Sequence, residues 1–140
     1  MKVYIGEADH NARELKIGYT EQTCWARCKK SDYTIFAAVE LPITSAETLF
    51  VESYVRLAFN AMTEIKQQIR TDYFLLQDNF PLRGPNGAIE EDLMSWGYCW
   101  LKQFVEEAVE IIDRKRAFSK TDPIPPLLRC HIGYVSPYTY

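Results

Sequence analysis

Residues 2–20, KVYIGEADHNARELKIGYT, hold two short apolar segments that each contain a tyrosine and a glycine. The segments at 2–6 and 15–19 have the length and the branched or aromatic content of short strands. The insert between them, GEADHNAR, supplies the glycine, aspartate and asparagine that turns favour. The stretch therefore predicts a β-hairpin with a long loop, and the other elements are placed outward from it.

Capping residues and apolar periodicity predict the elements that follow the hairpin. Thr44 and Glu47 have the spacing of a capping box, and apolar residues at steps of three and four follow them, as is typical of a helix. The predicted elements are a helix over 21–30 that Thr20 caps, a strand over 32–42 that Pro42 closes, a helix over 45–67 and a short strand over 71–76.

The second half of the chain is organised around one long apolar helix. QDNFPLRGPNG, residues 77–87, has two prolines and two glycines and predicts a loop that is also a boundary. Residues 88–116 then show apolar side chains at alternating steps of three and four, which predicts a helix packed on the core or shared with another subunit. The tail over 121–140 carries four of the seven prolines and predicts an extended strap.

Composition limits the class of protein. The 140 residues are 47% hydrophobic, which is enough for one domain with a core of its own. The formal net charge of −3 means that the chain as a whole does not attract nucleic acid. No apolar run approaches the roughly 20 residues of a membrane span, so we expect a protein of the bacterial or phage-infected cytoplasm, without a membrane partner. The four cysteines are too few and scattered for a disulfide frame, so reduced thiols are expected.

The order of these features resembles the GIY-YIG nuclease superfamily, and most closely its T5orf172-like branch of phage and bacterial proteins. The two motifs are KVY, which contains Tyr4, and KIG, which contains Lys16 and Gly18, with eleven residues between Tyr4 and Lys16. Arg27 follows Gly18 by nine positions. In ETLFVESYVRLAF, Glu52 is followed by apolar residues three and seven positions later, as in the family.

The resemblance implies a fold as well. It covers residues 1–80 and implies an α+β domain, with a small three-stranded, mainly antiparallel GIY-YIG-like sheet flanked by helices. Residues 81–140 form a C-terminal extension that holds the long helix and the proline-rich tail, packed on the same domain or on a dimer partner.

The resemblance further implies a metal-dependent endonuclease that hydrolyses the phosphodiester bonds of DNA. Glu52 would bind one Mg²⁺ or Mn²⁺ ion, and the Arg27 guanidinium would bind the scissile phosphate. Tyr4 would orient or deprotonate the attacking water. A free phenol ionises near pH 10, so deprotonation requires a lowered pKa, and we expect Lys16 on the paired strand to lower it.

Four further residues are assigned by proximity to this set. Gly18 would allow a close approach of phosphate or a neighbouring strand, and Tyr19 is an auxiliary catalytic phenol. Lys29 and Lys30 would join Arg27 in binding DNA. One departure from the family is that no histidine follows Arg27, where many relatives carry one.

Other functions stay open. Residues 1–86 hold ten Lys or Arg against eleven Asp or Glu, so even the matched region is close to neutral, which counts against strong DNA binding. The chief alternative is a non-catalytic protein on the same scaffold, phage-encoded for example, that binds another protein as a regulator or inhibitor. A homodimer through the 88–116 helix is possible on either hypothesis. A zinc site built from Cys24, Cys28, Cys130 and His131 is a third alternative.

Overall fold

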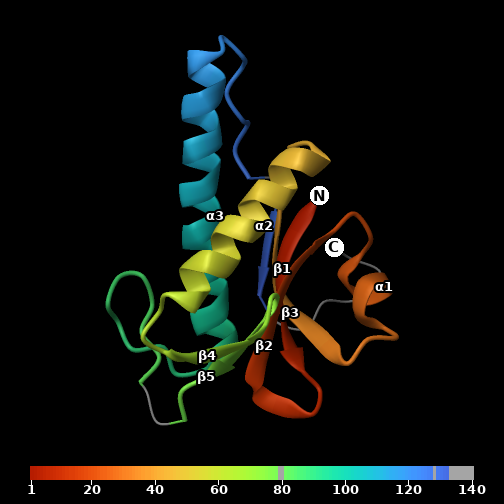
Figure 1. Ribbon diagram of the computed structural model, residues 1–140, viewed down its shortest axis with the longest axis vertical. Helices are drawn as coiled ribbons and strands as arrows, with labels where there is room; N and C mark the ends of the chain where they lie inside the picture. Colours follow the sequence, from red (N-terminus) through yellow and green to blue (C-terminus); the bar gives the residue numbers. More distant parts are fainter. Residues whose placement is uncertain (79–80, 128, 133–140) are drawn as a thin grey trace.

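The computed structural model describes residues 1–78, 81–127 and 129–132 and has an α+β fold (Figure 1). Its elements in chain order are β1 (Lys2–Ala8), β2 (Asn11–Thr20), α1 (Cys24–Cys28), β3 (Tyr33–Glu40), α2 (Ser45–Asn60), β4 (Ile65–Arg70), β5 (Tyr73–Leu76), α3 (Leu93–Phe118) and β6 (Arg129–Ile132). Within the described residues the strands form one six-stranded sheet in the order β4-β5-β2-β1-β3-β6. Every neighbouring pair is antiparallel. The expected three strands were therefore too few. β5 and β4 extend the central β2-β1-β3 part beyond β2, and β6 extends it beyond β3.

The β1–β2 hairpin forms, but the prediction of a long loop was wrong. Ala8 pairs with Asn11, which leaves only Asp9 and His10 between the strands. The polar insert becomes strand because pairing satisfies its backbone groups, and a register shift after Glu7 absorbs the irregularity.

The α2 helix begins at the predicted place and ends early. Thr44 and Glu47 form the predicted capping box. The helix ends at Asn60, however, and β4 occupies the residues predicted as its last turns. Within β4 only Ile65 is buried, and the polar side chains that follow it are typical of an edge strand. Pairing with β5, which lies later in the chain, makes this segment a strand although its sequence pattern favours a helix.

The other two helices begin later in the chain than predicted. The N-cap of α1 is Thr23, whose hydroxyl accepts from the Ala26 N–H, and the predicted cap Thr20 instead accepts from the Gln22 N–H. Asp92 caps α3, so this helix begins after residue 88. Among the described residues, no helix is both long enough and apolar enough to cross a membrane.

The two faces of the sheet are covered differently (Figure 1). On one face α2 and α3 pack over a large apolar core that includes Ile5, Ile17, Phe59 and Trp96. The apolar stripe of α3 is thus buried within its own chain. On the other face the short α1 packs against β3, over a smaller cluster that contains Tyr4. The candidate site lies on this second face.

Candidate functional site

Tyr4 is fully buried on the α1 face, and its hydroxyl is paired with a second phenol. The Tyr4 and Tyr33 oxygens lie 2.8 Å apart, and either can be the donor. Tyr4 pairs with Gly18 across the hairpin, and a Cβ atom at position 18 would lie 2.5 Å from the Tyr4 oxygen. Gly18 therefore provides the space for the Tyr4 ring, which is the close approach from a neighbouring strand that its position suggested.

The pKa of Tyr4 moves in the direction opposite to the expected one. Burial raises it well above the usual range, the hydrogen bond with Tyr33 adds to the rise, and the Arg27 charge opposes it without reversing it. Tyr4 therefore remains protonated at neutral pH. The expectation of a lowered pKa was wrong because the phenol is desolvated, and because the Lys16 ammonium has a different partner.

That partner is Asp72, in the turn between β4 and β5. The Lys16 ammonium lies 2.5 Å from the Asp72 carboxylate, and it is 5.2 Å and 5.3 Å from the ring centroids of Tyr33 and Tyr73. Lys16 is only 7% exposed. Burial alone would raise the pKa of Asp72, but the hydrogen bond and charge of Lys16 outweigh it and lower that pKa. The site thus contains a carboxylate that stays ionised and neutralises the lysine.

Glu52 reaches this cluster by electrostatics and not by contact. It lies on α2, on the opposite side of the sheet from Tyr4, and is 5% exposed. Its carboxylate forms an ion pair with the Arg56 guanidinium at 2.9 Å. Burial raises the pKa of Glu52, the charges of Arg56 and Lys16 lower it, and Asp72 raises it again, with a net rise. Lys16 and Asp72 are therefore within electrostatic range of Glu52. The net rise means that the charges of Arg56 and Lys16 only partly offset the cost of burying the Glu52 carboxylate.

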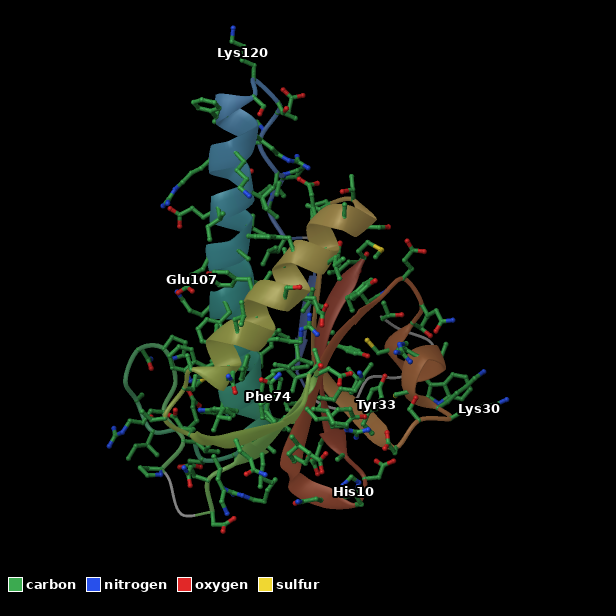
Figure 2. All side chains as sticks on the ribbon, in the orientation of Figure 1. His10, Lys30, Tyr33, Phe74, Glu107 and Lys120 are labelled. Atoms are coloured by element: carbon green, nitrogen blue, oxygen red, sulfur yellow. The ribbon has the colours of Figure 1, made fainter. Side chains whose placement is uncertain are left out.

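The remaining predicted site residues are divided between the two sides of the sheet. Arg27 on α1 is close enough to act on the Tyr4 phenol. Lys29 and Lys30 are exposed just after α1, and Figure 2 shows Lys30 and Tyr33 on the side of the molecule that carries α1. Tyr19 does not join them. Successive strand residues point to opposite faces, so Tyr19 lies on the face opposite Gly18, and its proposed catalytic role stays a prediction.

Two residues of the cluster, Tyr33 and Asp72, were not singled out in the sequence. Tyr33 is placed by its pairing with Ala8, and its ring lies over Gly6, where a Cβ atom would be 2.7 Å from it. A signal existed in the two glycines, because Gly6 and Gly18 share a face with Tyr4 and each leaves space for a tyrosine ring. Recognising their partners requires the strand register, which the sequence does not supply.

The zinc alternative gains no support from the described part of the chain. There, no three His, Cys, Asp or Glu side chains are grouped as metal ligands. Burial raises the pKa of Cys24 to about 11, so its thiol stays protonated at neutral pH. The side chains of Cys130 and His131 lie outside the described residues.

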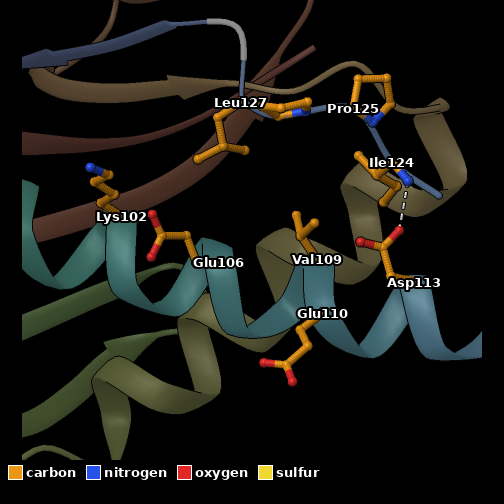
Figure 3. Close-up of a pocket in the computed structure, with 9 residues that line it drawn as sticks. Lys102, Glu106, Val109, Glu110, Asp113, Ile124, Pro125 and Leu127 are labelled. Atoms are coloured by element: carbon orange, nitrogen blue, oxygen red, sulfur yellow. Dashed lines mark hydrogen bonds between the residues drawn. The ribbon is translucent and has the colours of Figure 1, made fainter.

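A groove of about 520 Å³ lies between α3 and the extended segment after it, away from the Tyr4 cluster (Figure 3). Val109, Ile124 and Leu127 provide apolar walls, and Glu106 and Glu110 lie at its sides. The Asp113 carboxylate accepts the Ile124 N–H at 2.6 Å, which holds the extended segment against the helix.

Together, the α1 face of the sheet holds a hydrogen-bonded pair of phenols, a lysine paired with a carboxylate, and an arginine, while Glu52 on α2 is linked to this face through the charges of Lys16 and Asp72. Compared with family models, curated proteins and solved structures, the chain matches none.

Proposed function

We propose that this protein is a GIY-YIG-like, metal-dependent endonuclease that hydrolyses phosphodiester bonds of DNA. The observation that supports the proposal is electrostatic convergence. Arg27 acts on Tyr4, Lys16 acts on Glu52, and Asp72 acts on both Tyr4 and Glu52. These residues are far apart in the sequence, and phosphodiester hydrolysis needs their groups: a cation for the phosphate, a carboxylate for a metal ion, and donors for the oxygens that gain charge.

Each side chain has a role that agrees with its charge and hydrogen-bonding groups. Arg27 binds the non-bridging oxygens of the scissile phosphate through its planar guanidinium. Tyr4, which stays protonated, orients the attacking water or donates to a phosphate oxygen and does not act as the base. Tyr33 fixes the position of the Tyr4 hydroxyl. Glu52 would hold a single Mg²⁺ or Mn²⁺ ion, which supplies charge neutralisation at the phosphate when it is bound.

The Lys16 ammonium lies within electrostatic range of two carboxylates, Asp72 and Glu52, and its position gives it a role in substrate binding. In the absence of substrate it is paired with Asp72. A phosphate that enters beside Tyr4 competes with Asp72 for the same ammonium, so the ion pair keeps the cation in place until the phosphate arrives. Asp72 then limits the positive charge of a buried site that would otherwise hold an unpaired lysine.

The test is cleavage of supercoiled plasmid at low salt with Mg²⁺ or Mn²⁺. We expect the wild-type protein to cut and Glu52→Gln to lose cutting. Glu110→Gln is the matched control, because Glu110 also pairs with an arginine four residues later but is exposed on α3. Plasmid that stays intact over the metal titration, or equal cutting by Glu52→Gln and the wild type, contradicts the proposal.

A second readout does not depend on turnover. A ligand that binds only the folded state raises the melting temperature by mass action. We expect Mg²⁺ or Mn²⁺ to raise the melting temperature of the wild-type protein and of Glu110→Gln, and not that of Glu52→Gln. Equal shifts in all three proteins would remove Glu52 as the metal ligand.

The groove beside α3 favours the alternative, a non-catalytic protein that binds another protein as a regulator or inhibitor. Its apolar walls and the carboxylates of Glu106 and Glu110 suit a protein segment that carries apolar and basic side chains. On this alternative a complex with such a protein survives Arg27→Ala and Glu52→Gln but is lost with Val109→Asp. If the wild type cuts plasmid and Val109→Asp weakens no protein complex, the nuclease is favoured.

A further inference from the structure

Trp25 is the tryptophan whose position packing does not explain. It is 45% exposed, whereas Trp96 is fully buried. Trp100 stacks on Phe104 with ring centroids 5.1 Å apart, and its indole N–H donates to the Arg83 carbonyl at 2.6 Å. An indole with nearly half of its surface in water leaves a large apolar area available for binding.

α1 holds Trp25 in a fixed place beside the sheet. The Ala26 N–H donates to the Thr23 hydroxyl at 3.2 Å, which caps the helix. Cys24, directly before Trp25, is fully buried against the Tyr4 cluster. The cap and the buried residue position the helix, so the exposed indole is presented by an anchored element and not by a free loop.

The segment that carries Trp25 is cationic. CWARCKK, residues 24–30, contains Arg27, Lys29 and Lys30 and no acidic residue. The Lys29 ammonium lies 4.8 Å from the Trp25 ring centroid. Arg27, on the same short helix, is close enough to act electrostatically on Tyr4. α1 thus extends from the candidate site to an indole with positive charges around it.

We propose that Trp25 stacks on a base of single-stranded or locally unpaired nucleic acid while Lys29 and Lys30 bind its phosphates. Aromatic faces combined with cations are the chemistry of single-strand binding, because every base has a face that can stack. In a duplex those faces are already stacked on one another, so the indole selects strands with an accessible base. The charge complementarity is local, which is consistent with a chain whose net charge is −3.

Trp25 and Arg27 are two positions apart on the same short helix, so they project to nearly opposite sides of it. A strand whose phosphate lies at Arg27 must therefore pass around α1 to bring a base to Trp25. The inference rests on the proposed function, since it assigns the substrate class of the same site: nucleic acid with an unpaired base near the scissile phosphate.

Binding of a labelled oligo(dT) of about 12 nucleotides, measured by fluorescence anisotropy at low salt, tests this inference. We expect Trp25→Ala to weaken binding about 5- to 150-fold and Trp25→Phe to retain most of it, because stacking on one base is worth this range. The control is Phe118→Ala. Phe118 is 93% exposed near the end of α3, where Arg114 and Arg116 are paired with Glu110 and Glu47. Figure 2 shows the adjacent Lys120 far from Lys30. Phe118→Ala is expected to bind as the wild type does.

The outcomes separate this inference from the proposed function. Three results would overturn the stacking role. Trp25→Ala could bind oligo(dT) as tightly as the wild type does, or the wild type could fail to bind oligo(dT). Trp25→Ala could also weaken binding of a fully paired duplex of the same length as much as it weakens binding of oligo(dT). If the wild type cuts plasmid, and Trp25→Ala binds oligo(dT) as tightly as the wild type, the inference fails and the nuclease stands. If no metal supports cutting while binding still depends on Trp25, the nuclease fails and the stacking surface stands.

Discussion

The two faces of the sheet are built from the same strands and differ in what they bury. The α2/α3 face packs Ile5, Ile17 and Phe74 under two long helices in a continuous apolar core. The α1 face carries a helix of only five residues and buries the polar side chains of Tyr4 and Lys16. Because alternate residues of one strand point to opposite faces, each strand serves both.

This difference indicates where folding and chemistry are separated. Apolar side chains on the α2/α3 face gain free energy by leaving water, at about 25 cal/mol per Å². The polar groups of the α1 face lose solvation when they are buried and need partners to compensate. Tyr4 has Tyr33 and Lys16 has Asp72. Apolar variants of the first face should therefore change stability, while variants of the second face, and of the charged Glu52 on α2, should change stability less and chemistry more.

The largest effect is expected for Phe59→Ala on the α2/α3 face. Phe59 is fully buried and makes edge-on contacts with the rings of Trp96 and Phe104, with centroids 5.9 Å and 5.3 Å away. Removing the ring should lower the free energy of unfolding by about 3–5 kcal/mol, measured by urea denaturation. Leu57→Ala, on the same helix but 72% exposed, is the control and should change it by less than about 0.5 kcal/mol. Similar costs for both variants would contradict the position of the core.

The second effect is expected for Gly18→Ala on the α1 face. The added Cβ would lie 2.5 Å from the Tyr4 oxygen and 2.7 Å from its ring carbon, so the ring must move, at a cost of about 1–3 kcal/mol. In a Tyr4→Ala background the obstacle is gone, and Gly18→Ala should be neutral or stabilising by up to about 1 kcal/mol. Urea denaturation of the four proteins in this cycle measures the coupling. An additive cycle would mean that Tyr4 does not occupy the space above Gly18.

Local signals predicted the beginnings of elements better than their ends. Thr44 and Glu47 predicted the start of α2, because a capping box is read from residues that are neighbours in the chain. Residues 65–67 were wrongly assigned to the same helix, because their strand conformation depends on pairing with β5, a partner that lies later in the chain. The hairpin loop was overestimated for the same reason, since its length follows from the register of Ala8 and Asn11.

The candidate site was predictable as a set of residue types and not as a set of partners. The motif spacing selected Tyr4 and Arg27, which the fold brings into electrostatic range. It did not reveal that Lys16 is neutralised by Asp72, because Asp72 was expected within a strand over 71–76, and its place in the β4–β5 turn depends on how those two strands pair. The expected pKa of Tyr4 had the wrong sign, since the degree of burial of a strand residue depends on what packs over it.

A smaller effect is expected for Tyr33→Phe. The variant removes one hydroxyl of a buried pair and leaves the Tyr4 hydroxyl without this partner, at a cost of about 1 kcal/mol in unfolding free energy. Tyr4→Phe with Tyr33→Phe should cost less than the sum of the two single variants, because the double variant leaves no orphaned hydroxyl. Strict additivity in thermal or urea denaturation would mean that the two hydroxyls are not paired.

The same pair makes a prediction about alkaline pH. Burial raises the pKa of Tyr4 in the folded state, so above about pH 10 the unfolded chain loses a proton that the folded chain retains. The stabilisation is therefore complete below about pH 10 and is lost as the pH rises further. Tyr4→Phe should flatten the fall in stability above that pH, in unfolding curves measured on both sides of it. An unchanged alkaline fall would show that other groups cause it.

The smallest effect is expected for Glu52→Gln, and it has the opposite sign. Burial raises the pKa of Glu52 even though Arg56 and Lys16 oppose the rise, so the charged carboxylate is a net cost to the folded protein. Without metal, Glu52→Gln should therefore raise the melting temperature at neutral pH. The gain should disappear below about pH 4, where glutamate is protonated in both states. Glu110→Gln, whose carboxylate is exposed, should show no such gain. A residue that lowers stability where it is ionised, and whose removal abolishes metal-dependent cutting, is retained for chemistry and not for folding. A lower melting temperature for Glu52→Gln at neutral pH would instead assign Glu52 to a structural ion pair with Arg56.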